Sequence, residues 1–225
     1  LWAGADVNSS TTSGLIVAYK DDGTLDATVA GSGTISVSPS SIGLGGTKLI
    51  FESVAVDDQG RILVAGTGSE SSGFDMVLAR FNPDGTPDTS FGTNGVVMSA
   101  INNGALGSGL SLTADGKILV TGMSASASTA TALLTLWRFN EDGTPDTSFN
   151  GSGHIQVDGI SVDPTAVNIE TFRCFPALQP DDSMVVGCQQ SGSAGPWKIT
   201  RLQADGSVDN GFGTGGYITG AANQE

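Results

Sequence analysis

RFNEDGTPDTSF, at residues 138–149, is one copy of a motif that the chain repeats around an Asp-Gly pair. The central glycines Gly23, Gly85, Gly143 and Gly206 are 62, 58 and 63 residues apart. Periods of this order are typical of solenoids and propellers, in which each unit buries its apolar face against a neighbour. The four copies are DGTLD at 22–26, DGTPD at 84–88, DGTPD at 142–146 and DGSVD at 205–209.

The composition predicts an all-β fold. The chain is poor in charged residues and rich in Gly, Ser and Thr, which suits many short strands joined by tight turns. We therefore expect a β-propeller or propeller-like array of about four four-stranded units in a single repeat domain. The units span approximately residues 1–47, 48–104, 105–170 and 171–225.

The second unit shows the expected strands most clearly, at residues 53–56, 61–65, 76–81 and 95–99. The run Ile62-Leu63-Val64-Ala65 is apolar throughout, which indicates a strand covered on both faces. Residues 1–4 align with 63–66, so the first unit lacks its opening strand. Either the N-terminal strand closes a ring by pairing with strands from the C-terminal end, or the chain is a piece of a longer array.

Charge argues against a nucleic-acid partner. Acidic residues outnumber basic ones 23 to 9, and such a field repels phosphate backbones. No apolar run approaches the ~18 residues that a membrane-spanning helix needs, so we expect no direct membrane insertion.

The two cysteines, Cys174 and Cys188, lie on a predicted hairpin. A two-residue turn at Asp181-Asp182 would place residue 174 opposite residue 189, so a disulfide needs a small shift of register. The alternative is a pair of buried free thiols. A disulfide would place the protein outside the cytosol.

The segment from Asp115 to Gly122, followed by residues 136–143 and by Asp146-Thr-Ser-Phe149, resembles the bacterial delta-60 repeat. The resemblance covers essentially the whole chain. It implies a propeller-like fold in large secreted or surface proteins, with no established catalytic activity. The first unit departs from the pattern, with Ala18 where the others have Arg and Val29 where they have Phe.

Three side chains recur together and predict a structural constellation. An ion pair between the repeated Arg and Asp, buried between blades, would fix their register, and the repeated Phe belongs to the core. The residues are Arg80, Arg138 and Arg201; Asp88, Asp146 and Asp209; and Phe91, Phe149 and Phe212.

The sequence gives little indication of a catalytic site or a metal site. The Asp-Gly loops lack the distal Glu of a calcium loop, and clustered Cys and His of a zinc site are absent. His154, on a predicted outer strand, has no identifiable nucleophile partner. We expect no metal, no cofactor and no catalytic residue.

The loops between the second and third strands of each unit are the predicted binding region. They span residues 5–14, 67–75, 123–132 and 189–196, and we call them the loop rim. Polar side chains there suit hydrogen bonding to sugars or proteins, with aromatic platforms nearby, and the alternative is a set of plain connectors. The candidates are Asn8, Ser69, Glu70, Phe74, Asp75, Ser126, Thr129, Gln190 and Trp197, whereas Trp2 and Trp137 are expected to pack.

These observations favour a non-enzymatic binding or display module of an extracellular, cell-surface or periplasmic protein. Its expected partner is a glycan or protein on another cell surface, as in an adhesin or a fibre, where a homo-oligomer such as a trimer is possible. One alternative is a polysaccharide hydrolase or lyase, for which Glu170 is the candidate carboxylate. The other is a structural spacer.

Overall fold

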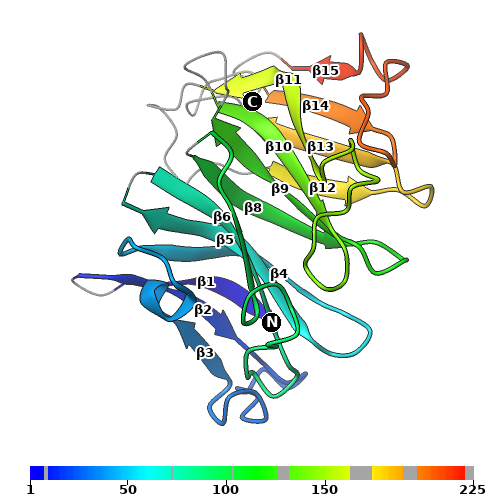
Figure 1. The fold of residues 1–225 in the computed structure, drawn as a ribbon. Helices are drawn as coiled ribbons and strands as arrows, with labels where there is room; N and C mark the ends of the chain where they lie inside the picture. The colour runs from blue at the N-terminus through cyan, green and yellow to red at the C-terminus, as the bar shows by residue number, and fades with distance from the viewer. Residues whose placement is uncertain are drawn as a thin grey trace.

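The strands form antiparallel sheets that follow one another in chain order, which we call blades one to four (Figure 1). The computed structural model describes residues 1–7, 10–71, 73–102, 104–125, 132–162, 174–189 and 197–220. Blade one contains β1 (Trp2–Val7), β2 (Thr12–Val17) and β3 (Thr34–Val37); blade two contains β4 (Leu49–Val56), β5 (Ile62–Glu70), β6 (Gly73–Phe81) and β7 (Val96–Ser99); blade three contains β8 (Ala105–Leu112), β9 (Ile118–Ala125), β10 (Ala132–Phe139) and β11 (His154–Val162); blade four contains β12 (Cys174–Leu178), β13 (Met184–Gln189), β14 (Trp197–Leu202) and β15 (Tyr217–Thr219).

The blades pack face to face as a propeller-like array, as the repeat predicts. Blades two, three and four each have four strands, and blade one has three because its opening strand is missing. The opening strands of the other blades lie together, since β8 contacts both β4 and β12. Among the described residues β1 pairs with β2 alone, and blades one and four lie at opposite ends of the array (Figure 1). The described strands therefore do not close a ring.

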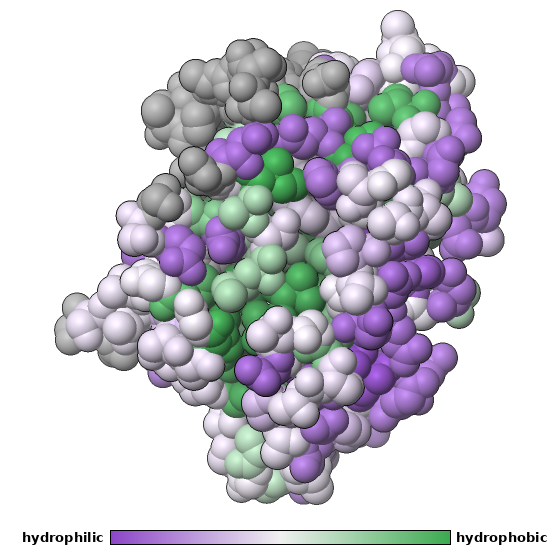
Figure 2. Space-filling view, viewed as in Figure 1, coloured by the Kyte–Doolittle hydropathy of each residue, from purple (hydrophilic) through white to green (hydrophobic). Residues whose placement is uncertain are grey.

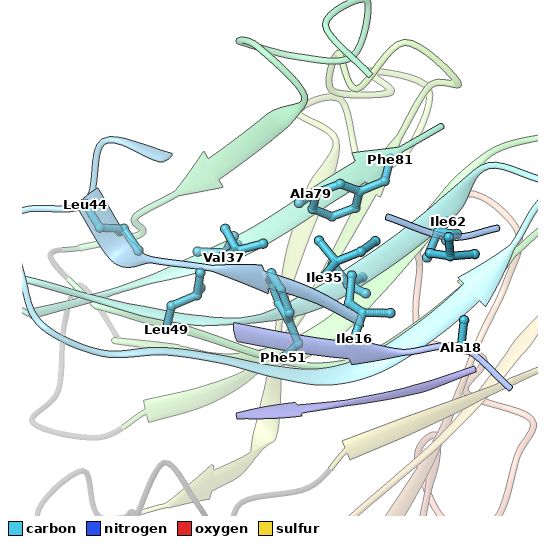
Figure 3. Close-up of a cluster of buried hydrophobic side chains, with 13 residues drawn as sticks. Ile16, Ala18, Ile35, Val37, Leu44, Leu49, Phe51, Ile62, Ala79 and Phe81 are labelled. Atoms are coloured by element: carbon cyan, nitrogen blue, oxygen red, sulfur yellow. The ribbon is translucent and has the colours of Figure 1, made fainter. Parts of the chain in front are cut away.

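Three apolar clusters hold the blades together, one between each neighbouring pair. In the first cluster, Ile16 and Ile35 of blade one lie with Phe51 of blade two (Figure 3). The run at 62–65 serves two clusters at once: Ile62 and Val64 face blade one, while its other two residues face blade three. This confirms that the strand is covered on both faces.

Polar side chains gather where the turns lie. In the space-filling view, hydrophilic residues follow the right-hand side, which carries the turns of the blades in Figure 1 (Figure 2). The described part of the chain contains the short 3-10 helix η1 (Pro39–Ile42) and no helix long and apolar enough to cross a membrane.

The turns between the first and second strands of blades two, three and four share a five-residue design. In the β8–β9 turn, the amide of Thr113 donates to the carbonyl of Lys117, and Gly116 has a φ of 81°. In the β12–β13 turn, Gln179 donates to Ser183 in the same way, and Asp182 takes the left-handed position with a φ of 59°. The turn is therefore one residue longer than the sequence predicts, because an aspartate occupies a position that glycine usually fills.

This turn places Cys174 directly opposite Cys188, and the two form a disulfide with a Cα–Cα distance of 4.6 Å. The register predicted from the sequence, with 174 opposite 189, is wrong by the one residue that Asp182 adds. The disulfide itself is confirmed, and no free cysteine remains in the described residues. Both cysteines are buried in the cluster between blades three and four.

Reducing this disulfide is expected to lower the free energy of unfolding by about 3 kcal/mol. The bond closes a loop with a sequence separation of 14, and a loop of that size restricts the unfolded chain by about this amount. Urea unfolding with and without a reductant measures the difference. The Cys174→Ala, Cys188→Ala double variant is the control, because its unfolding should not respond to the reductant. Equal midpoints for the oxidised and reduced native chain would contradict the prediction.

Candidate functional site

Part of the predicted loop rim is strand. Residues 67–71 and 73–75 belong to the end of the β5–β6 hairpin, in which Ser69 lies opposite Phe74 and Glu70 lies opposite Gly73. In blade one, β1 extends to Val7 and β2 begins at Thr12, so the loop expected at 5–14 is also shorter. The expectation of loops at these positions is wrong, because the strand pairing continues through polar residues that resemble a loop in the sequence.

Ser69 and Glu70 hold the connection between blades one and two. The Ser69 hydroxyl accepts a hydrogen bond from the Lys48 amide at 2.8 Å, and its carbonyl accepts one from Gly46. Glu70 Oε2 accepts from the Gly45 amide at 3.0 Å. These polar atoms stabilise the chain that leads into β4.

Asp75 lies on β6 opposite Gly68, beside this connection. Partial burial, and then the negative charge of Glu70, raise the pKa of the Asp75 carboxyl above its ordinary value. A carboxyl whose pKa is raised by folding binds its proton more tightly in the folded chain. The charged form of Asp75 therefore reduces stability at neutral pH.

Asp75→Asn is expected to raise the thermal midpoint at pH 7, with a gain in stability below about 1 kcal/mol because the group is partly exposed. The direction of the stability change follows from the raised pKa of Asp75. The destabilisation by the charged carboxylate is absent below the ordinary pKa of 3.8 and develops as the pH rises through the pKa of the folded chain. Thermal unfolding at pH 7 and at pH 3 tests this. A variant that is less stable than the native chain at pH 7, or equally shifted at both pH values, would contradict it.

Of the remaining candidates on the loop rim, the structure describes Trp197 alone. Trp197 begins β14 and is 44% exposed. Trp137 is buried as expected, but Trp2 is 50% exposed, with its ring against Gly4 of the same strand and outside the apolar clusters. Asn8, Ser126, Thr129, Gln190 and the candidate carboxylate Glu170 lie outside the described residues.

The repeated Arg, Asp and Phe come together in blades two, three and four, and we call this group the blade clasp. In blade two, Arg80 Nε donates to Asp88 Oδ2 at 2.8 Å, and its guanidinium carbon lies 4.5 Å from the centre of the Phe91 ring. Asp88 Oδ1 accepts from both the amide and the hydroxyl of Ser90. The three predicted ion pairs form, but the prediction that they are buried is wrong for Arg201–Asp209 in blade four, which is partly exposed.

The clasp also crosses to the next blade. Arg80 Nη1 donates to the carbonyl of Glu141 in blade three, and Arg138 Nη1 donates to the carbonyl of Ala204 in blade four. Beside them, the Gly92 amide donates to the carbonyl of Asp142, and the Asn150 amide donates to that of Asp205. The clasps of blades two and three therefore bind the Asp-Gly turn of the following blade through backbone carbonyls.

Blade one has a reduced clasp. Its Ala30 amide donates to the Asp84 carbonyl at 2.8 Å, which matches the backbone contact of the other blades. Ala18 occupies the arginine position and is buried in the first apolar cluster with Val29, which replaces Phe. The contact between blades one and two therefore has apolar packing where the other blade contacts have an ion pair.

A polar pocket of about 570 Å³ lies between the turns of blades two and three. One wall is the β4–β5 turn with Asp57, Asp58 and Gln59, and the other is the β8–β9 turn at 113–116. Both turns join a first strand to a second strand, so they lie at the end of the blades opposite the second-to-third hairpins. The pocket is therefore not on the predicted loop rim.

Arg61 connects the β4–β5 turn with Glu141, which precedes the Asp-Gly turn of blade three and also lines this pocket. Its Nε donates to Asp57 Oδ2 at 2.6 Å, and its Nη2 donates to Glu141 Oε1 at 2.7 Å and to Gln59 Oε1 at 2.9 Å. Burial works against the charged guanidinium, but the hydrogen bonds and charges of Glu141 and Asp57 outweigh it and raise the pKa of Arg61. The pocket thus contains a permanently charged arginine held by two carboxylates.

The charges of the lining indicate which ligands the pocket can accept. Four carboxylates line it, from Asp57, Asp58, Asp115 and Glu141, against the two arginines Arg61 and Arg80. This excess of negative charge disfavours an anion and suits a neutral or basic group that donates hydrogen bonds. Asp58 and Gln59 are exposed, and they offer such a ligand oxygen atoms at the mouth of the pocket.

Sequence reasoning assigned these turn residues a structural role alone. A signal was present, because Arg61 stands where the third unit has Lys117 and the fourth has Ser183, and Glu141 stands where the second has Pro83. These two departures from the repeat lie close together in space, so they make the interface between blades two and three different from the others. The signal needs the packing of the blades before it can be recognised.

No three side chains of His, Cys, Asp or Glu within the described ranges are placed so that they could hold a metal ion. His154 begins the outer strand β11, as predicted. The aspartates of the Asp-Gly turns are engaged locally: Asp142 Oδ1 accepts from the amide and hydroxyl of Thr144, and these bonds lower the pKa of Asp142.

Comparison with protein families agrees with the fold. Residues 60–91, 113–149 and 179–212 are similar to the family described as "Domain of unknown function (DUF5122) beta-propeller". Each matched segment runs from the first hairpin turn of a blade to its clasp Phe. The fold and these matches define a propeller-like repeat protein. A comparison with curated proteins gives no match.

Proposed function

We propose that this chain is a non-enzymatic binding or display module of a secreted or cell-surface protein, as its resemblance to the delta-60 repeat implies. The pocket between blades two and three is the binding site that its geometry supports best. Its polar lining, and the oxygens of Asp58 and Gln59 at its mouth, suit a neutral glycan or a basic segment of a protein. The disulfide supports a location outside the cytosol.

The carboxylates of the pocket support binding over catalysis. Asp57 and Glu141 both accept hydrogen bonds from Arg61, which fixes the positions of their carboxylate oxygens. A glycosidase needs one carboxyl that keeps its proton at neutral pH and faces a second, charged one. The arginine between the two favours a fixed hydrogen-bonding surface.

The test is binding of the labelled chain to a glycan array and to a library of basic peptides. The variant Asp58→Ala, Gln59→Ala removes the exposed acceptors, and we expect about tenfold weaker binding. It removes the Gln59 bond of Arg61 but leaves the bonds of this arginine to Asp57 and Glu141. Asp21→Asn is the matched control, since Asp21 stands at the position of Glu141 in blade one, outside this pocket. Binding that the double variant leaves unchanged would remove the pocket from the proposal.

Two further outcomes decide between classes of function. A chain that binds nothing on either array would overturn the binding role and leave the structural spacer as the better account. Release of new reducing ends from a bound polysaccharide would instead favour the hydrolase or lyase. The same samples serve for both measurements.

A further inference from the structure

The outward face of blade four exposes apolar side chains at positions that are buried or partly buried in the other blades. Trp197 is 44% exposed, whereas Met76 and Leu134, which hold the same position relative to the clasp arginine in blades two and three, are fully buried. Ile218 is 40% exposed at the position of Val97, which packs in the cluster between blades two and three. In those blades the face is covered by the blade that follows.

The outward face of blade one shows the complementary situation. Trp2 aligns with Val64, and Tyr19 aligns with Phe81. In blade two these positions are 0% and 5% exposed, because blade one covers them. In blade one itself, Trp2 is 50% exposed and Tyr19 is 52% exposed. The two ends of the array therefore present the two halves of one blade-to-blade interface.

The polar groups of the clasp divide between the same two ends. At blade four, Arg201 pairs with Asp209 through Nε and Nη2, and within the described part of the chain its Nη1 has no acceptor. The Gly213 amide, at the position of Gly92, likewise has no acceptor there. At blade one, the carbonyls of Asp21 and Asp22 stand where Glu141 and Asp142 accept in blade three, and no described group donates to them.

We propose that blade four of one copy of this chain docks head-to-tail on blade one of a second copy. Arg201 and the Gly213 amide would donate to the carbonyls of Asp21 and Asp22 of that copy. Trp197, Ile218 and Phe175, which is 54% exposed on β12, would pack against its Trp2 and Tyr19. The design is continuous with the interface that the chain uses between its own blades. Because the two surfaces differ, the contact is heterologous and generates either a closed ring or a filament.

The test is sedimentation of the native chain over a range from about 1 µM to 1 mM, in enough salt to screen its net charge of −14. The mass should rise in multiples of 22.6 kDa. Trp197→Asp should block the blade-four end and Trp2→Asp the blade-one end, and each should weaken association at least tenfold. Both side chains are half exposed, so the single variants should fold as the native chain does.

Mixing the two variants distinguishes head-to-tail docking from a symmetric contact. Trp197→Asp retains an intact blade-one end and Trp2→Asp an intact blade-four end, so the mixture should form a dimer that neither variant forms alone. Met98→Asp is the control, because Met98 is 40% exposed on blade two, away from both ends, and it should associate as the native chain does. A native chain that stays monomeric up to 1 mM, or a mixture without rescue, overturns the proposal.

Discussion

Replacing Asp88 with alanine is expected to cost about 3–5 kcal/mol of the free energy of unfolding. The change leaves the Arg80 guanidinium without its carboxylate at a site where the arginine side chain is 3% exposed, and an unpaired buried charge is destabilising by about this amount. It also removes the acceptor of the Ser90 amide and hydroxyl. Urea unfolding followed by circular dichroism measures the loss.

Asp209→Ala is the matched control, because blade four carries the same ion pair without a following blade among the described residues. There the arginine side chain is 34% exposed and the aspartate 25%, so water replaces the lost partner and the cost should be much smaller than that of Asp88→Ala. The comparison is made at low protein concentration, where blade four remains uncovered. Equal costs for the two variants would show that burial between blades does not set the strength of the clasp.

The Asp88 contribution also has a defined dependence on pH. Burial opposes the charged carboxylate, but the bonds from Ser90 and the charge of Arg80 outweigh it and lower the pKa of Asp88 below its ordinary value of 3.8. The stabilisation is therefore fully present above pH 3.8 and is lost as the pH falls through the folded pKa. The difference between the native chain and Asp88→Ala should shrink below pH 3.8.

Replacing Phe149 with alanine should have an effect of similar size, about 3–5 kcal/mol, because it empties a fully buried aromatic position. The ring lies in the cluster between blades three and four, beneath Arg138 at 4.7 Å and against Gly206 of the next turn. Its loss removes apolar contact and the cation–π partner together. Thermal and urea unfolding both report the change.

Phe212→Ala tests whether the neighbouring blade causes this effect. Phe212 holds the same position in blade four, where its ring is half-buried and Arg201 lies 5.0 Å from the ring centre. We expect a cost below about 2 kcal/mol, since less apolar area leaves water on folding. A loss as large as that of Phe149→Ala would mean that the contacts of the ring within its own blade dominate.

The architecture could be predicted from the sequence because the same local sequence patterns recur in several units. The Asp-Gly turns, the strand covered on both faces at 62–65 and the Arg–Asp pairs each follow from short-range chemistry. The missing strand of blade one followed from the alignment of residues 1–4 with 63–66. These features need no knowledge of how the blades pack.

The errors have local physical causes. The cysteine register was off by one residue because Asp182 adopts a left-handed conformation that only the folded turn reveals. The loop expected at 67–75 is a hairpin because tertiary hydrogen bonds to Gly46 and Lys48 support strand pairing through residues of low strand propensity. The pocket depends on two turns that are far apart in sequence and meet only when blades two and three dock.

The acceptors of the blade clasp are main-chain carbonyls, which has a consequence for how such a protein can change during evolution. Residues 83, 141 and 204 are proline, glutamate and alanine, yet a carbonyl is available at each of these equivalent positions. A unit copied by tandem duplication would present a compatible neighbour immediately, without a matching substitution in the unit before it. The number of blades can then grow or shrink, while turn side chains such as Glu141 remain free to diverge toward new ligands.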